Sequence, residues 1–219
     1  MRSISKEKIF IIILILFSLS INQYYGNRGI FPVDSLAHFD TGFRILLGEH
    51  PFKNYWTVSG PFVDYIQAIF FYFLGVSWQS YVFHASLINA VLSVATFIVF
   101  RNFNLNIYYS FIYSLLFSIL AYPTSGTPFV DHHSAFFSLL GIYSLILGIK
   151  SEKKLYWILL PIFFGFAFLS KQVPSSYVII SVILILIIFS LAQKKYYWVK
   201  YSFLSSILFI VSLLIFGKI

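Results

Sequence analysis

The chain is dominated by long apolar segments that short polar segments separate. A helix needs about 20 mostly apolar residues to cross the hydrocarbon core of a bilayer, and several of these segments approach that length. The pattern therefore predicts an all-α polytopic membrane protein. The apolar segments are 9–25, 61–76, 81–100, 107–122, 134–149, 155–170, 176–193 and 199–217.

The positive charges indicate which of these segments cross the membrane. Lys and Arg gather in small groups between apolar segments, as in the cytoplasmic loops of membrane proteins. If every segment crossed, the groups at 150–154 and 194–195 would lie outside, against that rule. Segment 61–76 is short and carries Asp64 and Gln67 in its first turns. We therefore predict that 61–76 lies in the outer interface. The chain then has about seven spans and a cytoplasmic N-terminus.

The composition supports the same class. Apolar residues make up 59% of the 219 residues and charged residues only 10%, against about 25% charged in a soluble domain. The absence of cysteine excludes disulfide frameworks and thiolate metal sites. The formal charge of +8 is spread along the chain instead of forming one basic face, so we expect no nucleic acid partner.

The long first outer loop, 26–80, contains a second predicted interfacial helix over 35–47. Asp34 precedes this helix at the N-cap position, so capping is an alternative to any chemical role. His38 and Thr41 share one face of the helix with Asp34, and Asp40 and Arg44 form an i,i+4 pair for which a surface ion pair is the simpler interpretation. The apolar stripe of the helix comprises Leu36, Phe39, Phe43 and Leu46 or Leu47.

This topology places most groups capable of acid–base chemistry at the outer face. All five histidines and five of the seven carboxylates lie there. In the second outer loop, Asp131 precedes His132 and His133, and a carboxylate beside an imidazole can bind a divalent metal or relay protons. Two adjacent histidines cannot both point the same way on a helix, so at most one of them is a partner for Asp131. We predict Asp131 and His132 as the metal pair, with helix capping as the alternative role of Asp131. Lys171 in the third outer loop could bind a lipid phosphate, or simply extend to the interface.

Several function classes find no support in the sequence. The glycine-rich phosphate loop, the GxSxG elbow and the HExxH pair are all missing. A multi-span transporter or a lipid-carrier flippase remains the alternative to an enzyme. Carriers often show internal repeats and ionisable groups at mid-membrane, and neither is evident in this sequence.

A run in the first outer loop resembles integral-membrane glycosyltransferases of the GT-C fold, of the protein O-mannosyltransferase and aminoarabinose-transferase type. Asp131 and the pair Gly165 and Lys171 follow in the order found in that family. Two features depart from the family pattern. Ser35 stands where the family usually has a second acid, and residues 57–60 carry no charge. The run comprises Asp34, Phe39, Leu46-Leu47-Gly48-Glu-His-Pro51-Phe-Lys-Asn-Tyr-Trp56, Gly60-Pro61, Tyr65 and Phe70-Phe-Tyr-Phe-Leu-Gly75.

The resemblance implies transfer of a sugar from a polyprenyl-phosphate carrier to a hydroxyl of a lipid, glycan or protein acceptor. Asp34 and Asp131 would be the catalytic acids, and Lys171 and Lys53 would bind the phosphate of the lipid carrier. A divalent metal, if used, would be bound by Asp131 and His132. We expect residues 1–219 to be the N-terminal seven-span module, or a fragment, of a longer enzyme. Such an enzyme would lie in a bacterial inner membrane with its active face outside.

Overall fold

The computed structural model describes residues 6–29, 36–57 and 59–216, and these residues form helices without a β-sheet. This confirms the predicted all-α class. The helices are α1 (Lys6–Gly26), α2 (Ala37–Leu46), α3 (Phe62–Leu74), α4 (Trp78–Asn102), α5 (Ile107–Leu120), α6 (Val130–Ser151), α7 (Lys154–Ser170), α8 (Gln172–Ala192) and α9 (Tyr197–Phe216).

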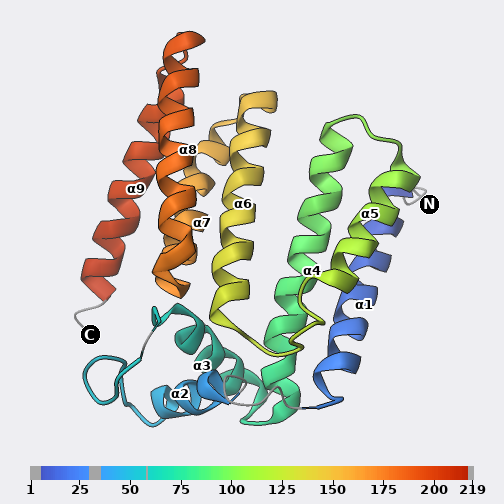
Figure 1. The fold of residues 1–219 in the computed structure, drawn as a ribbon, viewed down its shortest axis with the longest axis vertical. Helices are drawn as coiled ribbons and strands as arrows, with labels where there is room; N and C mark the ends of the chain where they lie inside the picture. The colour runs from blue at the N-terminus through green and yellow to red at the C-terminus, as the bar shows by residue number, and fades with distance from the viewer. Residues whose placement is uncertain (1–5, 30–35, 58, 217–219) are drawn as a thin grey trace. The chain divides into compact units, whose positions relative to one another are not determined.

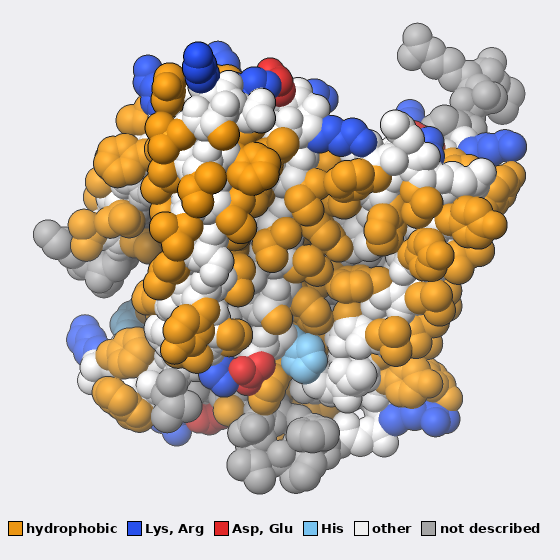
Figure 2. All heavy atoms as spheres, turned by 45° about the horizontal axis from the view of Figure 1, so that its top comes forward, with side chains coloured by type: hydrophobic (Ala, Val, Ile, Leu, Met, Phe, Trp, Pro, Cys, Tyr) orange, Lys and Arg blue, Asp and Glu red, His pale blue; other side chains and the backbone are white. Residues whose placement is uncertain are grey.

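Five of the described helices are long and apolar enough to cross a membrane, namely α1, α4, α6, α8 and residues Tyr197–Ile215 of α9. Helices α3, α5 and α7 are apolar but shorter. The exposed flanks of the helices are mostly hydrophobic, and Lys and Arg side chains gather near the helix ends (Figure 2). These features identify an integral membrane protein, while the count of seven spans stays a prediction.

Local turn chemistry separates α3 from α4. Helix α3 ends at Leu74, and the next residue, Gly75, has a φ of +80°, which suits glycine. Two residues later Ser77 caps α4: its hydroxyl accepts a hydrogen bond from the Ser80 backbone N–H, and the Ser80 hydroxyl accepts one from the Ser77 N–H. This capping box starts α4 at Trp78, three residues before the apolar segment 81–100.

The chain divides into two compact units, Met1–His132 and His133–Ile219. In the first unit α1, α4 and α5 run side by side, and α2 and α3 lie across one end of α4 (Figure 1). The Asn22 amide of α1 donates hydrogen bonds to the Ser86 hydroxyl of α4 (2.9 Å) and to the Gly126 carbonyl (3.2 Å). Small and polar side chains at these contacts are typical of helix association in lipid.

In the second unit α7, α8 and α9 pack together around aromatic and aliphatic side chains. Trp157 of α7 and Trp198 of α9 stack with their ring centres 4.9 Å apart. Gly165 of α7 allows Phe209 of α9 to approach, because a Cβ atom at Gly165 would lie 2.2 Å from the Phe209 ring. At one end, Lys195 binds Glu152 and lowers the pKa of that carboxyl.

Gly126 is a position in the first unit where a larger side chain does not fit. Its φ is +70°, and a Cβ atom there would lie 2.5 Å from the Cα atom of Gly26. Gly126→Ala should therefore lower the free energy of unfolding by about 2 kcal/mol, through backbone strain and overlap. Thermal unfolding of the purified protein in detergent, followed by circular dichroism, measures the effect.

The control variant is Gly29→Ala, since no atom lies within 4 Å of a Cβ at Gly29. Unfolding of Gly126→Ala at the same temperature as Gly29→Ala would contradict the close contact between α1 and the 121–129 loop.

Candidate functional site in the first outer loop

A buried carboxylate joins helices α2 and α3. Asp64 lies in the first turn of α3 and is fully buried. Its Oδ1 atom accepts a hydrogen bond from the Thr41 hydroxyl (2.6 Å) and lies 2.7 Å from Nδ1 of His38. His38 and Thr41 are three residues apart on α2 and so present their side chains on the same face. One carboxylate oxygen therefore holds two side chains of the neighbouring helix.

A second polar contact joins α3 to α4. Oε1 of Gln67, also fully buried, lies 2.9 Å from Nδ1 of His84, and the His84 ring stacks on Phe70. On the other side, α2 approaches Gln67 closely, because a Cβ atom at Gly42 would lie 2.8 Å from Cγ of Gln67. The three helices are therefore linked by a line of buried polar side chains.

Two polar atoms of this line have no hydrogen-bond partner among the described residues. They are Oδ2 of Asp64 and Nε2 of Gln67, which lie one helical turn apart on α3. Buried polar atoms are nearly always paired, so such exceptions are often found at functional sites. The cluster is accordingly a candidate for chemistry as well as for helix packing.

Sequence reasoning found the shared face of His38 and Thr41 but missed their partner. The sequence places His38 on one face of the predicted helix 35–47 and Asp64 in the first turns of segment 61–76. The two are 26 residues apart in the chain, and no local spacing predicts a contact over that distance. The one available clue was an acid in the first turns of an otherwise apolar segment.

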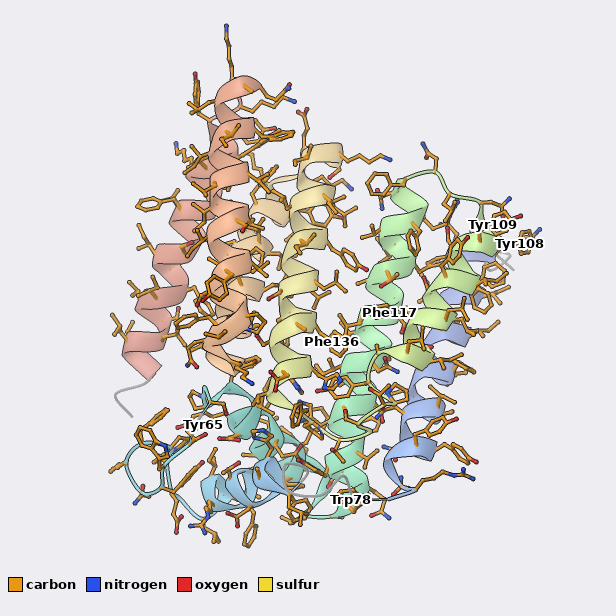
Figure 3. The ribbon with its side chains drawn as sticks, in the orientation of Figure 1. Tyr65, Trp78, Tyr108, Tyr109, Phe117 and Phe136 are labelled. Atoms are coloured by element: carbon orange, nitrogen blue, oxygen red, sulfur yellow. The ribbon has the colours of Figure 1, made fainter. Side chains whose placement is uncertain are left out.

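Two tyrosines interact electrostatically with the same carboxylate. Burial raises the pKa of Tyr55 and that of Tyr65, and the negative charge of Asp64 raises both further. Both phenols are therefore neutral at physiological pH and can donate hydrogen bonds. Tyr65 projects from α3, as labelled in Figure 3, and its hydroxyl lies 3.2 Å from Nδ1 of His50.

Lys53, a predicted phosphate-binding residue, lies on a tight turn between α2 and α3. The Phe52 N–H donates to the Tyr55 carbonyl (2.8 Å), and the His50 N–H donates to the Asn54 side chain (3.0 Å). Lys53 is exposed on this turn. Its aromatic neighbour Trp56 is 79% exposed, so the turn presents a cation beside an aromatic surface.

The predicted pair Asp40 and Arg44 is observed. Nε of Arg44 donates to Asp40 (2.7 Å), and Nη1 donates to Glu49 (3.1 Å). These hydrogen bonds raise the pKa of Arg44. Arg44 is therefore engaged on the exposed side of α2, away from the face that carries His38.

Asp131 and His132 lie in the first turn of α6. The His132 ring stacks on Tyr122 with ring centres 5.2 Å apart and contacts Phe129 edge-on. The described residues contain no group of three or more His, Asp or Glu side chains that could hold a metal. Asp131 and His132 supply two donors, fewer than the three or four protein ligands of a typical zinc site. On their own they do not make a metal site.

Lys171 lies between α7 and α8 in the second unit. Its carbonyl oxygen accepts hydrogen bonds from Ser134 (3.1 Å) and Ser175 (2.6 Å), and its N–H donates to the Ala167 carbonyl (3.0 Å). The backbone at Lys171 is therefore fixed by α6, α7 and α8 together. The remaining predicted acid, Asp34, lies outside the described residues.

An apolar groove of about 600 Å³ lies among α7, α8 and α9. Its lining is almost wholly hydrophobic and includes Leu160, Phe164, Val182, Leu186 and Phe209. A groove of this size and polarity suits a hydrocarbon chain better than a polar solute.

Comparison with known proteins identifies the family. Residues 50–216 match the model of the dolichyl-phosphate-mannose-protein mannosyltransferase family, so the chain belongs to that family. No curated protein and no solved structure matched the chain. The protein is thus a membrane glycosyltransferase of the mannosyltransferase kind, as the resemblance of the first outer loop implied. The matched residues include Lys53, Asp131, His132 and Lys171, whereas Asp34 precedes them.

The buried carboxylate should also contribute to stability. Asp64→Ala removes the partner of His38 and Thr41, and loss of one member of a buried pair costs about 3 kcal/mol. We expect a clear fall in the unfolding temperature in detergent. The control Asp40→Ala removes an exposed acid of the same loop and should change the unfolding temperature little. Equal effects of the two variants would show that the Asp64 contacts do not hold α2 on α3.

Proposed function

We propose that this protein transfers a sugar from a polyprenyl-phosphate carrier to an acceptor hydroxyl at the outer face of the membrane. The observation that carries the proposal is the family match over residues 50–216. The polar cluster in the first outer loop and the apolar groove in the second unit are both consistent with it. The acceptor class is a lipid, a glycan or a protein.

The chemistry needs a proton acceptor and a group that stabilises phosphate. The acceptor oxygen bonds to the anomeric carbon of the sugar, while the bond from that carbon to the phosphate oxygen breaks. The electron pair of the broken bond stays on the phosphate. We assign proton removal from the hydroxyl to Asp34, which acts as general base, and a supporting role to Asp131.

We propose that Lys171 and Lys53 bind the departing phosphate, because a cation stabilises the negative charge that develops on the phosphate oxygens. The fixed backbone at Lys171 supports this role, since it limits where the ammonium group can lie. A divalent metal at Asp131 and His132 would serve the same purpose, and it would need further ligands beyond these two.

A lipid-linked donor is supported by the groove among α7, α8 and α9. A polyprenyl chain is a long branched hydrocarbon, and the groove offers apolar side chains from three helices. A carrier protein without transferase activity is the weaker proposal, because the matched family is one of transferases.

The test is mannose transfer in membrane vesicles from cells that express the chain, which retain native lipid and protein acceptors. We expect label to move from polyprenyl-phosphate mannose, and not from nucleotide-linked mannose, to other products. Asp34→Asn should lower the rate at least about 100-fold while the protein still folds. The matched control Asp40→Asn should transfer normally.

A normal transfer rate in Asp34→Asn would contradict the proposed catalytic role of Asp34. Transfer from the nucleotide-linked sugar instead would contradict the lipid-linked donor.

A further inference from the structure

The second unit carries a cluster of lysines at one end. The loop between α6 and α7 lies beside the loop between α8 and α9, because Lys195 of one loop forms an ion pair with Glu152 of the other. The hydroxyl of Tyr197, at the start of α9, also donates a hydrogen bond to Glu152 (3.3 Å). Lys and Arg side chains gather at this end of the unit (Figure 2). The lysine cluster comprises Lys150, Lys153, Lys154, Lys194, Lys195 and Lys200.

The charge of the lysine cluster is poorly balanced by acids. Glu152 is the one carboxylate side chain in the sequence of residues 133–219, and it is already bound to a lysine of the cluster. Lys153, Lys194 and Lys200 are exposed and have no acidic partner among the described residues. Positive charges that lie close together repel one another. An anion that binds among these ammonium groups would therefore stabilise this end of the unit.

Aromatic side chains hold two of the lysines in place. Nζ of Lys154 lies 5.3 Å from the centre of the Tyr201 ring, and Nζ of Lys195 lies 5.5 Å from the centre of the Trp198 ring. Tyr196, between the two loops and α9, is 61% exposed. Tyrosine and tryptophan are enriched at the level of the lipid headgroups, where their polar and apolar parts meet water and lipid. The composition of this end is therefore that of a membrane interface.

The length of α7 places the start of this helix near the lipid phosphates. Helix α7 has 17 residues, which corresponds to about 26 Å, whereas the hydrocarbon core of a bilayer is about 30 Å thick. In the predicted topology α7 crosses the membrane and starts on the cytoplasmic side. Lys153 and Lys154 then lie at the level of the phosphate layer, and their long side chains can reach the phosphates.

Exposed apolar side chains continue from the lysine cluster along the same helices. Leu155 follows the cluster on α7, Leu191 precedes it on α8, and Leu204 follows it on α9, and all three are exposed. None of the three lines the groove to which we assigned the sugar donor. A free anion would contact the lysines alone. A phospholipid would also use the leucines, and the surface therefore fits an anion that carries hydrocarbon chains.

We propose that the lysine cluster binds the headgroup of an anionic phospholipid of the cytoplasmic leaflet. The cytoplasmic leaflet is rich in anionic lipids, and basic segments beside membrane helices bind them. The phosphate contacts the lysine ammonium groups, and the acyl chains lie against Leu155, Leu191 and Leu204. No covalent bond forms or breaks. The bound lipid holds the two loops together and is independent of sugar transfer.

The first test is thermal unfolding of the purified chain in a neutral detergent, with phosphatidylglycerol or phosphatidylcholine of the same acyl chains added. A ligand that binds only the folded state raises the unfolding temperature. We expect phosphatidylglycerol to raise it by about 5 °C and phosphatidylcholine to change it little. Inorganic phosphate at the same concentration should also have little effect, because it lacks the acyl chains.

A double variant tests whether the lysines are the binding residues. Lys153→Gln combined with Lys154→Gln removes two charges of the cluster and should lose most of the increase caused by phosphatidylglycerol. The matched control combines Lys6→Gln with Lys8→Gln, which removes two exposed charges of the first unit and should keep the full increase. Without added lipid, both double variants should unfold close to the wild-type temperature, because they change exposed side chains.

Glu152→Gln tests the proposal in the opposite direction. The change removes the carboxylate that competes for Lys195, so the cluster gains one available positive charge. The apparent Kd for phosphatidylglycerol, obtained from the concentration dependence of the unfolding temperature, should fall roughly fivefold. Lysines that serve only to orient the chain in the membrane would give no such gain.

Three results would overturn the proposal. The first is an equal increase with phosphatidylglycerol and phosphatidylcholine, which would show that the charge of the headgroup is not recognised. The second is a full increase in the variant that lacks Lys153 and Lys154. The third is an equal increase with inorganic phosphate, which would make the cluster a site for a free anion. None of these results depends on whether the chain transfers a sugar.

Discussion

The burial of the Asp64 carboxylate between α2 and α3 is the constraint on which the first outer loop depends. A carboxylate that leaves water loses several kcal/mol of solvation unless hydrogen bonds and a compensating charge replace it. Here the side chains of His38 and Thr41 supply the hydrogen bonds from the first turns of α2. These hydrogen bonds fix the position of α2 on α3. Asp64, on the otherwise apolar helix α3, forms a buried polar cluster with His38 and Thr41.

The same contacts connect α2 to α4 through α3. Helix α3 is fixed on α4 through Gln67 and His84, and α2 is fixed on α3 through Asp64. These contacts therefore fix the position of α2 relative to the long apolar helix α4. A catalytic site benefits from such support, because small displacements of reacting groups are costly in rate. The tight turn at Lys53 lies in the same loop.

Much of the fold followed from hydropathy, because apolar length determines which segments leave water. The helices expected over 35–47 and 61–76 are observed as Ala37–Leu46 and Phe62–Leu74. Helix α4 begins at Trp78, before the apolar segment 81–100, because its start is set by the hydrogen bonds of Ser77 and Ser80 and not by hydropathy. The partner of His38 could not be predicted, since it arises from the packing of two helices. The family was predictable because its first-loop residues stand close together in the sequence.

The central claim is that the acids of the first and second outer loops lie on one side of the membrane, which requires that α3 does not cross it. The chain has no cysteine, so single cysteines can be introduced at Asn27 and at Thr124, both exposed. Intact cells are then treated with a membrane-impermeant thiol reagent. The account predicts that both positions are labelled from outside. Labelling of Thr124→Cys only after permeabilisation, with Asn27→Cys labelled freely, would place the two loops on opposite faces and contradict the proposed site.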